Sequence, residues 1–140
     1  VLTSLQAMSQ QQQIAPKNSK AANVPVKRDS FYKLWLTFMT PLHKLTAKSV
    51  EVAAELLKER KRLSKVISDT TVLYKNLFSV ETKNYITNKC KITSSNYYVI
   101  MGKLRTAGFI VDNTINIKFI PDYNYEGDEY HLHIMFHLHD

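Results

Sequence analysis

Residues 85–110 read YITNKCKITSSNYYVIMGKLRTAGFI, and the spacing of the apolar residues in this stretch decides the fold. Ile86 and Cys90 lie one helical turn apart, and Ile92 follows at the junction with a second helix. That second helix has four apolar residues at the i, i+3/i+4, i+7 spacing of a buried stripe, namely Tyr97, Ile100, Met101 and Leu104. We therefore expect two short amphipathic helices, over about 80–90 and 94–107, joined as a helix-turn-helix.

The order apolar–x3–apolar–x–Ile–Thr–Ser–Ser–x–Tyr–x2–Ile–Met–x2–Leu–x3–Gly–Phe–Ile resembles winged helix-turn-helix DNA-binding domains of bacteria and of their phages and plasmids. The match covers about residues 80–120 and does not single out one family. Its most specific part is residues 104–110, where Gly108 would end the recognition helix in the manner of a C′ glycine and lead into the first wing strand. Lys91 departs from the pattern, because the turn often has glycine there.

If the apolar stripe is buried, the remaining side chains of the second helix face outward. A recognition helix presents its N-terminal residues to base edges in the major groove. Asn96 is suited to pair with adenine, and Val99 to contact a thymine methyl group. Gly102 would allow close approach of the backbone, and Thr93 could donate to phosphate oxygens at the helix N-terminus. The predicted DNA-binding residues are Ser94, Ser95, Asn96, Tyr98, Val99, Lys103, Arg105, Thr106, Lys89 and Lys91.

The expected wing does not support DNA binding in the same way. Its candidate loop, residues 121–129, contains Asp122, Glu126, Asp128 and Glu129 and has no lysine or arginine. Four carboxylates would repel a phosphate backbone. Either the helix face alone binds DNA, or the acidic loop contacts another protein.

The rest of the chain divides into an arm and a domain. Residues 1–28 are polar, include four consecutive glutamines from Gln10 and show no helical or strand period, so we expect a flexible arm that is a solvated linker or lies on a partner. Residues 29–140 would form one winged-helix domain. Asp29 and Ser30 are suited to cap its first helix.

Three helices are expected ahead of the helix-turn-helix. The first would bury Phe31, Leu34, Trp35 and Phe38 and stop at Pro41. The second would run from about 46 to 63 with Val50, Ala53, Ala54 and Leu57 inside, and end in the charged run of residues 58–65, interpreted as a solvated helix end rather than a phosphate site. The third, capped by Asp69, would bury Leu73, Leu77 and Phe78.

Beyond Gly108 the period changes to two, which predicts strands. Residues 109–111 would form a short strand, and residues 115–119 a second in which Ile115, Ile117 and Phe119 share a face. Residues 130–139 alternate strictly, so Leu132, Ile134, Phe136 and Leu138 would line one face of a last strand. The predicted fold class is α+β, a helical bundle with a helix-turn-helix followed by a small antiparallel sheet.

Four histidines share the other face of that last segment, namely His131, His133, His137 and His139. Neighbouring imidazoles on one strand face can share Zn²⁺ or Cu²⁺, which makes these residues weak candidates for a metal site. The plainer interpretation is a half-exposed strand face without metal. Acid sensitivity is a further hypothesis, because protonation near pH 6.5 would place like charges side by side.

Composition limits the function. The net charge is +7, and it is uneven: residues 1–111 carry 18 basic and 6 acidic side chains, whereas residues 112–140 carry one lysine and six acidic side chains. Such a basic excess favours a polyanionic partner. The single cysteine, Cys90, excludes an internal disulfide and suits a reducing compartment. No run of 18 apolar residues and no signal-peptide pattern is present, so no membrane association is expected.

We expect no enzyme, because no nucleophile arrangement, carboxylate pair or phosphate-binding glycine loop stands out. No cofactor is implied. The first hypothesis is a DNA-binding regulator or replication accessory of phage or plasmid type, acting on double-stranded DNA in the bacterial cytoplasm. The alternative is a phage virion or assembly adaptor that uses the winged helix, the arm and the loop 121–129 to contact other protein subunits.

Overall fold

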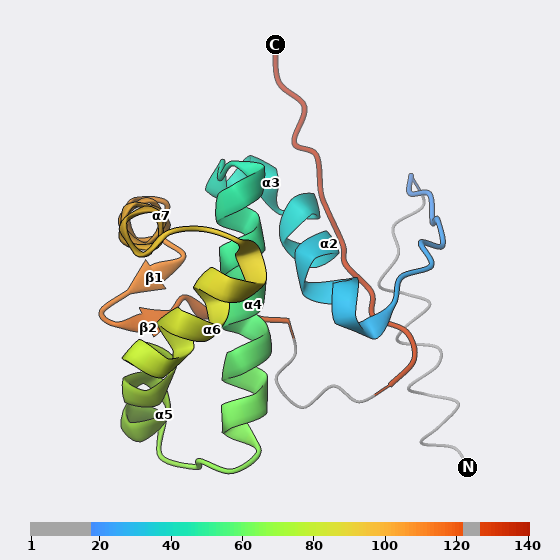
Figure 1. Ribbon diagram of the computed structural model, residues 1–140. Coiled ribbons are helices and arrows are strands. Elements are labelled where there is room, and N and C mark those ends of the chain that lie inside the picture. The colour runs from blue at the N-terminus through green and yellow to red at the C-terminus, as the bar shows by residue number, and fades with distance from the viewer. Residues whose placement is uncertain (1–17, 122–126) are drawn as a thin grey trace, which may run out of the picture.

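The computed structural model describes residues 18–121 and 127–140, and within those ranges the chain is mostly α-helical. Six α-helices precede one two-stranded antiparallel sheet (Figure 1). The helices are α2 (Phe31–Phe38), α3 (Thr40–His43), α4 (Ala47–Ser64), α5 (Thr70–Leu77), α6 (Val80–Cys90) and α7 (Ser94–Thr106). The strands are β1 (Ile110–Val111) and β2 (Thr114–Ile115), and two 3-10 turns lie at Arg28–Ser30 and Ile117–Phe119.

Helix α4 is the centre of the fold. The Thr46 side chain caps its N-terminus by accepting a hydrogen bond from the Ser49 amide, and no glycine or proline interrupts it. Ten of its 18 residues are buried, too many for a single stripe, because α2, α5, α6 and α7 all pack against it (Figure 1). The predicted inner residues Val50, Ala53, Ala54 and Leu57 are confirmed.

Helix α2 is rotated from the predicted stripe. Trp35 is buried as expected, but Phe38 is 45% exposed and Leu36 and Met39 are buried in its place. The Trp35 indole Nε1 donates to the Phe119 carbonyl at 2.9 Å, which satisfies a polar group that would otherwise be buried without a partner. That long-range bond ties α2 to the 3-10 turn after the sheet, a constraint that local spacing does not contain.

The first helix was expected to stop at Pro41. Helix α2 ends at Phe38, and Pro41 belongs to the short helix α3 that follows. Pro41 lies in the first turn of α3, the position where its missing N–H costs nothing. His43, at the end of α3, is buried, with Nε2 2.7 Å from the Leu36 carbonyl oxygen. The Leu45 amide donates to Nδ1 at 2.9 Å, so Nε2 carries the proton and the imidazole bridges α2 to the start of α4.

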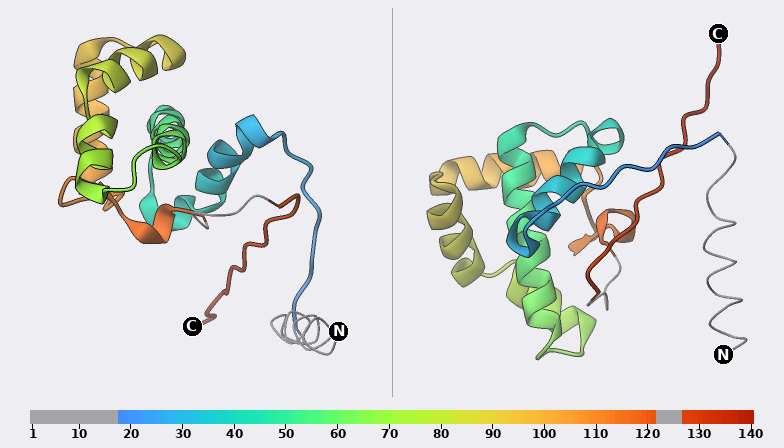
Figure 2. Two further views of the ribbon diagram at one scale, coloured as in Figure 1. Left: turned by 90° about the horizontal axis from the view of Figure 1, so that it is seen from below. Right: turned by 90° about the vertical axis from the view of Figure 1, so that its right-hand side faces the viewer.

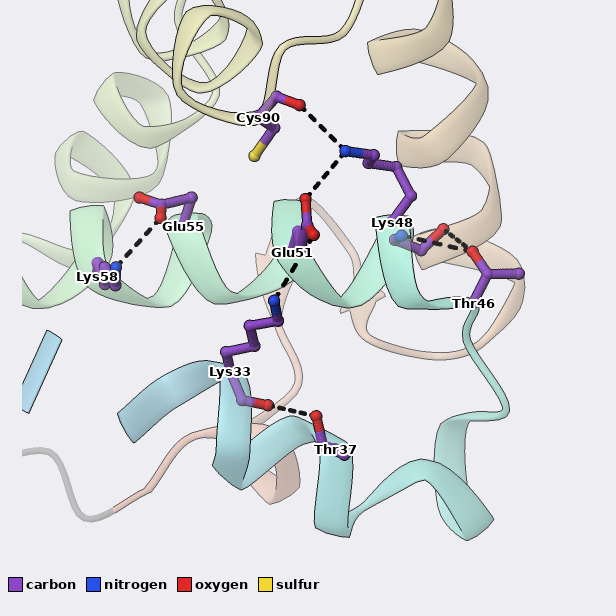
Figure 3. Close-up of polar contacts among 9 residues, drawn as sticks. Lys33, Thr37, Thr46, Lys48, Glu51, Glu55, Lys58 and Cys90 are labelled. Carbon is purple, nitrogen blue, oxygen red and sulfur yellow. Dashed lines mark hydrogen bonds and ion pairs between the residues drawn. The ribbon is translucent and has the colours of Figure 1, made fainter. Parts of the chain in front are cut away.

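A polar network joins α2, α4 and the end of α6 (Figure 3). Lys48 Nζ donates to the Cys90 carbonyl at 3.2 Å and to Glu51 Oε2 at 3.1 Å. The other Glu51 oxygen lies 3.6 Å from Lys33 Nζ on α2. Lys48 thus satisfies a carbonyl at the C-terminus of α6, where the helix itself leaves oxygens without partners.

The sheet is smaller than the alternation of residues 115–119 predicted. Ile110 pairs with Ile115 and Val111 with Thr114, and the two-residue turn between the strands, Asp112 and Asn113, has positive φ at both positions. Ile117 is 83% exposed because the chain turns into the 3-10 helix there, while Ile115 and Phe119 are buried. The pairing between β1 and β2 is therefore limited to two residues in each strand.

The last predicted strand is wrong. Residues 127–140 form no strand, and Leu132, Ile134, Phe136 and Leu138, expected inside, are exposed. The segment passes α2 and then leads away from the helices in every view (Figures 1 and 2). Tyr130 anchors its start, with its ring centroid 5.5 Å from that of Phe31 and 5.4 Å from that of Trp35. The alternation of apolar and polar residues predicted a strand, but within the described residues no second strand pairs with this segment.

The outcome is a mostly α fold with a terminal hairpin, which supports the predicted helical bundle and antiparallel pairing but not a three-stranded wing. Of the predicted arm, residues 18–27 form no helix or strand, and residues 1–17 lie outside the described part. Within the described ranges, no helix is long and apolar enough to cross a membrane.

The orientation of α7 can be tested by truncating one side chain on each of its faces. Leu104 is fully buried and Val99 is 57% exposed. Leu104→Ala should lower the free energy of unfolding by about 2–5 kcal/mol, whereas Val99→Ala should change it by less than about 0.5 kcal/mol. Urea denaturation measures both variants, and equal losses would contradict the orientation described.

The Glu51 network predicts a dependence of stability on pH. The hydrogen bond from Lys48 holds the Glu51 pKa below its ordinary value of 4.5. This carboxylate therefore stabilises the fold above about pH 4.5, and its contribution is lost as the pH falls through the lowered pKa. Glu51→Gln should be less stable at neutral pH and should lose less stability between about pH 6 and pH 3. Thermal unfolding at each pH measures this.

Glu81→Gln is the matched control for that measurement, because Glu81 is exposed and has no carboxylate–cation contact within the described residues. If Glu51→Gln and Glu81→Gln follow the same pH profile, Glu51 is not the source of the acid sensitivity.

Candidate nucleic-acid interface

Helices α6 and α7 lie within one residue of the bounds that the sequence predicted, and residues 91–93 join them. Ile86 and Cys90 of α6 are buried, and Ile92 in the turn packs against the core. Lys91 takes the left-handed conformation, with φ of 55°, and the Ile92 amide donates to the Thr87 carbonyl at 3.1 Å. Lys91 therefore adopts the backbone conformation that glycine usually supplies at such a turn.

Helix α7 begins at a side-chain cap. The Thr93 hydroxyl accepts a hydrogen bond from the Asn96 amide at 3.1 Å. The helix ends where Gly108 has a φ of +79°, the positive value expected of a C′ glycine. A cap on one side and a glycine on the other fix the length of the helix, and β1 follows directly.

The inward and outward faces of α7 are as the spacing predicted. Tyr97, Ile100, Met101 and Leu104 are all buried. Gly102 is partly exposed, and a Cβ added there would meet no atom within 4 Å, so the space over the helix is open. The predicted contact residues that are exposed are Ser94, Ser95, Asn96, Tyr98, Val99, Lys103, Arg105 and Thr106, together with Lys89 and Lys91.

The two cations of α7 lie on opposite flanks of the outer face. Successive residues of an α-helix are about 100° apart, so Lys103 and Arg105 diverge by about 200°. Arg105 lies on the flank of Tyr98, and Lys103 lies on the flank of Asn96. The centre of the face, between the two flanks, carries the small or uncharged residues Ser95, Val99, Gly102 and Thr106.

Lys83 on α6 joins this surface, although the sequence analysis did not include it. Its Nζ donates to Ser94 Oγ at 3.2 Å and to the Tyr98 hydroxyl at 3.5 Å, and it lies 5.3 Å from the centroid of the Tyr98 ring. The signal was present in the spacing, because Lys83 precedes Ile86 by three residues and Cys90 by seven and so shares the face that turns toward α7.

A shallow groove of about 130 Å³ lies beside that contact, between the start of α6, α7 and the hairpin. Its walls combine the cations Lys83 and Arg105 with aromatic and apolar side chains and contain no carboxylate. The lining residues are Phe78, Ser79, Val80, Lys83, Tyr97, Tyr98, Met101, Arg105, Ile110 and Asn113. The groove suits an anionic group better than a cationic one.

Neither buried ionisable group of the helix-turn-helix is activated. Burial raises the pKa of Tyr97 to about 12, so its phenol stays protonated at neutral pH. Burial, together with the nearby Glu55 and Glu51 carboxylates, raises the pKa of the Cys90 thiol. The Cys90 thiol therefore stays protonated at neutral pH, and it packs in the core, where its spacing from Ile86 placed it.

The charges of the chain divide by region. Between Thr82 and Val111 the sequence has five basic residues and no acidic one. Within the described ranges, no ion pair engages those five, which are Lys83, Lys89, Lys91, Lys103 and Arg105. By contrast, two cations near the end of α4 have carboxylate partners within the chain: Lys58 contacts Glu55 and Asp29, and Arg62 contacts Glu59 at 2.7 Å.

The acidic loop and the histidines lie elsewhere. Asp122 and Glu126 fall outside the described residues, whereas Asp128 accepts a hydrogen bond from Arg28 at 2.7 Å and Glu129 lies 3.6 Å from His131. His131, His133, His137 and His139 lie on the exposed C-terminal segment. Among the residues that can be described, no group of three or more histidine, cysteine or acidic side chains gathers as a metal site would require.

Comparison of the chain with protein-family models, with curated proteins and with solved structures found no match. Any function assigned to α6 and α7 therefore depends on their geometry and charge alone.

Proposed function

We propose that this protein is a non-enzymatic DNA-binding protein, of the kind used by phages and plasmids for regulation or replication, that inserts α7 into the major groove of duplex DNA. The observation that carries the proposal is the charge of the helix-turn-helix. Its five cations have no carboxylate partner within the described residues, while the exposed face of α7 that they border is free of acidic groups. Uncompensated charge of one sign favours a polyanion.

The dimensions of α7 fit this role. A helix with its side chains is about 10–12 Å across, and the major groove is about 12 Å wide. Lys103 and Arg105 lie on opposite flanks, so each can reach a different wall of phosphates while the uncharged centre of the face meets the base edges. Ser95, Val99 and Thr106 occupy that centre, and Asn96 lies near the N-terminal end.

The remaining contacts would position the helix. Lys89 and Lys91 precede α7 at the end of α6 and in the turn, where they can neutralise phosphates together with the hydroxyls of Ser94 and Ser95. Lys83 supports Tyr98 and supplies charge at the Arg105 flank. In this proposal Asn96 and Val99 discriminate between bases, and the lysines contribute affinity that does not depend on sequence.

A second candidate is an adaptor, such as a virion or assembly component, that binds protein rather than DNA. The exposed apolar C-terminal segment favours it, since Ile134, Phe136 and Leu138 are each at least half exposed. The adaptor hypothesis predicts no duplex affinity, so a single binding assay separates the two functions.

Salt dependence tests the proposed function. If five cations neutralise phosphates, a plot of log affinity against log salt concentration should have a slope of about −4.5 between roughly 50 and 200 mM salt. Reversing both charges in Lys103→Glu with Arg105→Glu should abolish binding. Fluorescence anisotropy with a labelled duplex pool measures both quantities. Absence of any salt-dependent affinity would overturn the proposal and leave the adaptor.

The control for that variant is Lys65→Glu with Lys75→Glu, which changes the net charge equally at two exposed lysines outside α6 and α7. The control should retain most of the affinity. Equal loss in both double variants would mean that total charge, rather than the surface of α7, attracts the DNA.

Lys83 should contribute as a phosphate contact. Lys83→Ala should weaken duplex binding roughly three- to tenfold for every DNA sequence and reduce the magnitude of the salt slope by about 1. Asn96→Ala, in contrast, should relax sequence preference with little change in slope. The same anisotropy titration measures both variants. A Lys83→Ala protein with unchanged slope would show that Lys83 only positions Tyr98.

A further inference from the structure

The C-terminal segment has a symmetry that the DNA-binding proposal does not use. Residues 131–139 read HLHIMFHLH, which is the same in both directions except that Ile134 and Phe136 exchange places about Met135. Histidines occupy one face of this pattern and apolar side chains the other, if the segment is a strand. Residues 131–139 thus alternate between the two faces and also read nearly the same in both directions.

Nothing in the described part of the chain covers this segment. Residues 131–140 are all exposed and belong to no strand, and the large apolar side chains among them range from 37% exposed at Leu132 to 93% at Leu138. At the start of the segment, Tyr130 packs on Phe31 and Trp35, and Asp128 pairs with Arg28. From there the segment leads away from the helices (Figures 1 and 2), and its exposed side chains are open to a second protein chain.

The chain's own sheet is not a suitable partner. The strands β1 and β2 are two residues long each, so neither edge offers a ladder that a nine-residue strand could use. An isolated alternating strand leaves its backbone donors and acceptors, and its apolar face, in water. The segment therefore requires a partner of its own length.

A second copy of the segment meets this requirement better than an unrelated strand. In an antiparallel pair centred on Met135, His131 lies opposite His139 and His133 opposite His137. Leu132 then lies opposite Leu138, Ile134 opposite Phe136, and Met135 opposite itself. In this register each histidine faces a histidine and each apolar side chain faces an apolar side chain. Matched pairs of this kind favour strand pairing, and the symmetric register is the one that a two-fold interface requires. This register also pairs all nine residues.

We propose that residues 131–139 pair with the same residues of a second copy of this chain as an antiparallel two-stranded ribbon, making the protein a dimer through its C-terminus. Because an isolated two-stranded ribbon is only marginally stable in water, the dimer is weak and depends on protein concentration. The proposal is independent of DNA binding and holds whether or not α7 contacts a duplex.

Sedimentation velocity of the full chain tests the proposal, over about a hundredfold range of concentration and with a chelator present so that metal bridging cannot join two chains. At about pH 7.5 the chain should shift from monomer to dimer as its concentration rises. A monomer at every concentration overturns the proposal.

Variants locate the interface. Ile134→Asp with Phe136→Asp should remove the dimer without changing the melting temperature of the monomer, because both side chains are exposed and outside the core. The control is Val66→Asp, at a residue that is 78% exposed and outside the segment; it should dimerise normally. Dimerisation of the double variant at wild-type strength contradicts the proposal.

Cross-linking tests the register and the identity of the partner. Met135→Cys should form a disulfide between two copies under mild oxidation, because residue 135 lies opposite itself, whereas Val66→Cys should not. Cys90 is buried and stays out of this reaction. Failure of Met135→Cys to cross-link where the sedimentation data show a dimer would rule out this ribbon as the interface.

Discussion

The burial of α4 among four other helices is the constraint on which the rest of the molecule depends. Because α2, α5, α6 and α7 all cover it, ten of its residues lose contact with water, including Glu55 and Glu59. Arg62 contacts both oxygens of Glu59 from one turn later, and Lys58 contacts Oε1 of Glu55, whereas Glu55 Oε2 is buried without a hydrogen-bond partner among the described residues. The packing leaves α7 with one buried face on the core and one open face, which is the geometry that any role for that helix requires.

The same packing separates the cations into two groups. On α2 and α4, Lys33, Lys48, Lys58 and Arg62 contact carboxylates and stabilise the fold. One such contact runs from Lys33 through Glu51 to Lys48 and the Cys90 carbonyl (Figure 3). On α6 and α7 the sequence has no carboxylate to meet, so the cations stay unneutralised at the surface. One part of the charge thus holds the helix-turn-helix in place, and the other part is available to a ligand.

The C-terminal segment shows the opposite situation, in which a strong local pattern finds no use within the chain. Alternation over residues 131–139 specifies a strand, but a strand is stable only when another backbone completes its hydrogen bonds. With each strand of the hairpin two residues long, that backbone has to come from outside. Because the segment reads nearly the same in both directions, a second copy of it matches its side chains well. The strand pattern that the chain itself does not pair therefore leads to the proposed two-fold dimer.

The sequence by itself determined the elements whose signals are local. The stripe from Tyr97 to Leu104, the cap at Asp69 and the glycine after α7 each act within one or two helical turns, and the predicted helices and outward residues of α7 followed from them. Only the tertiary structure decided what depends on distant contacts. The rotation of α2 follows from the Trp35 bond to Phe119, the recruitment of Lys83 from the approach of α6 to α7, and the exposure of the last segment from the absence of a partner strand within the described chain. The spacing of apolar residues indicates which face of a segment is apolar. Whether another element covers that face depends on the tertiary packing.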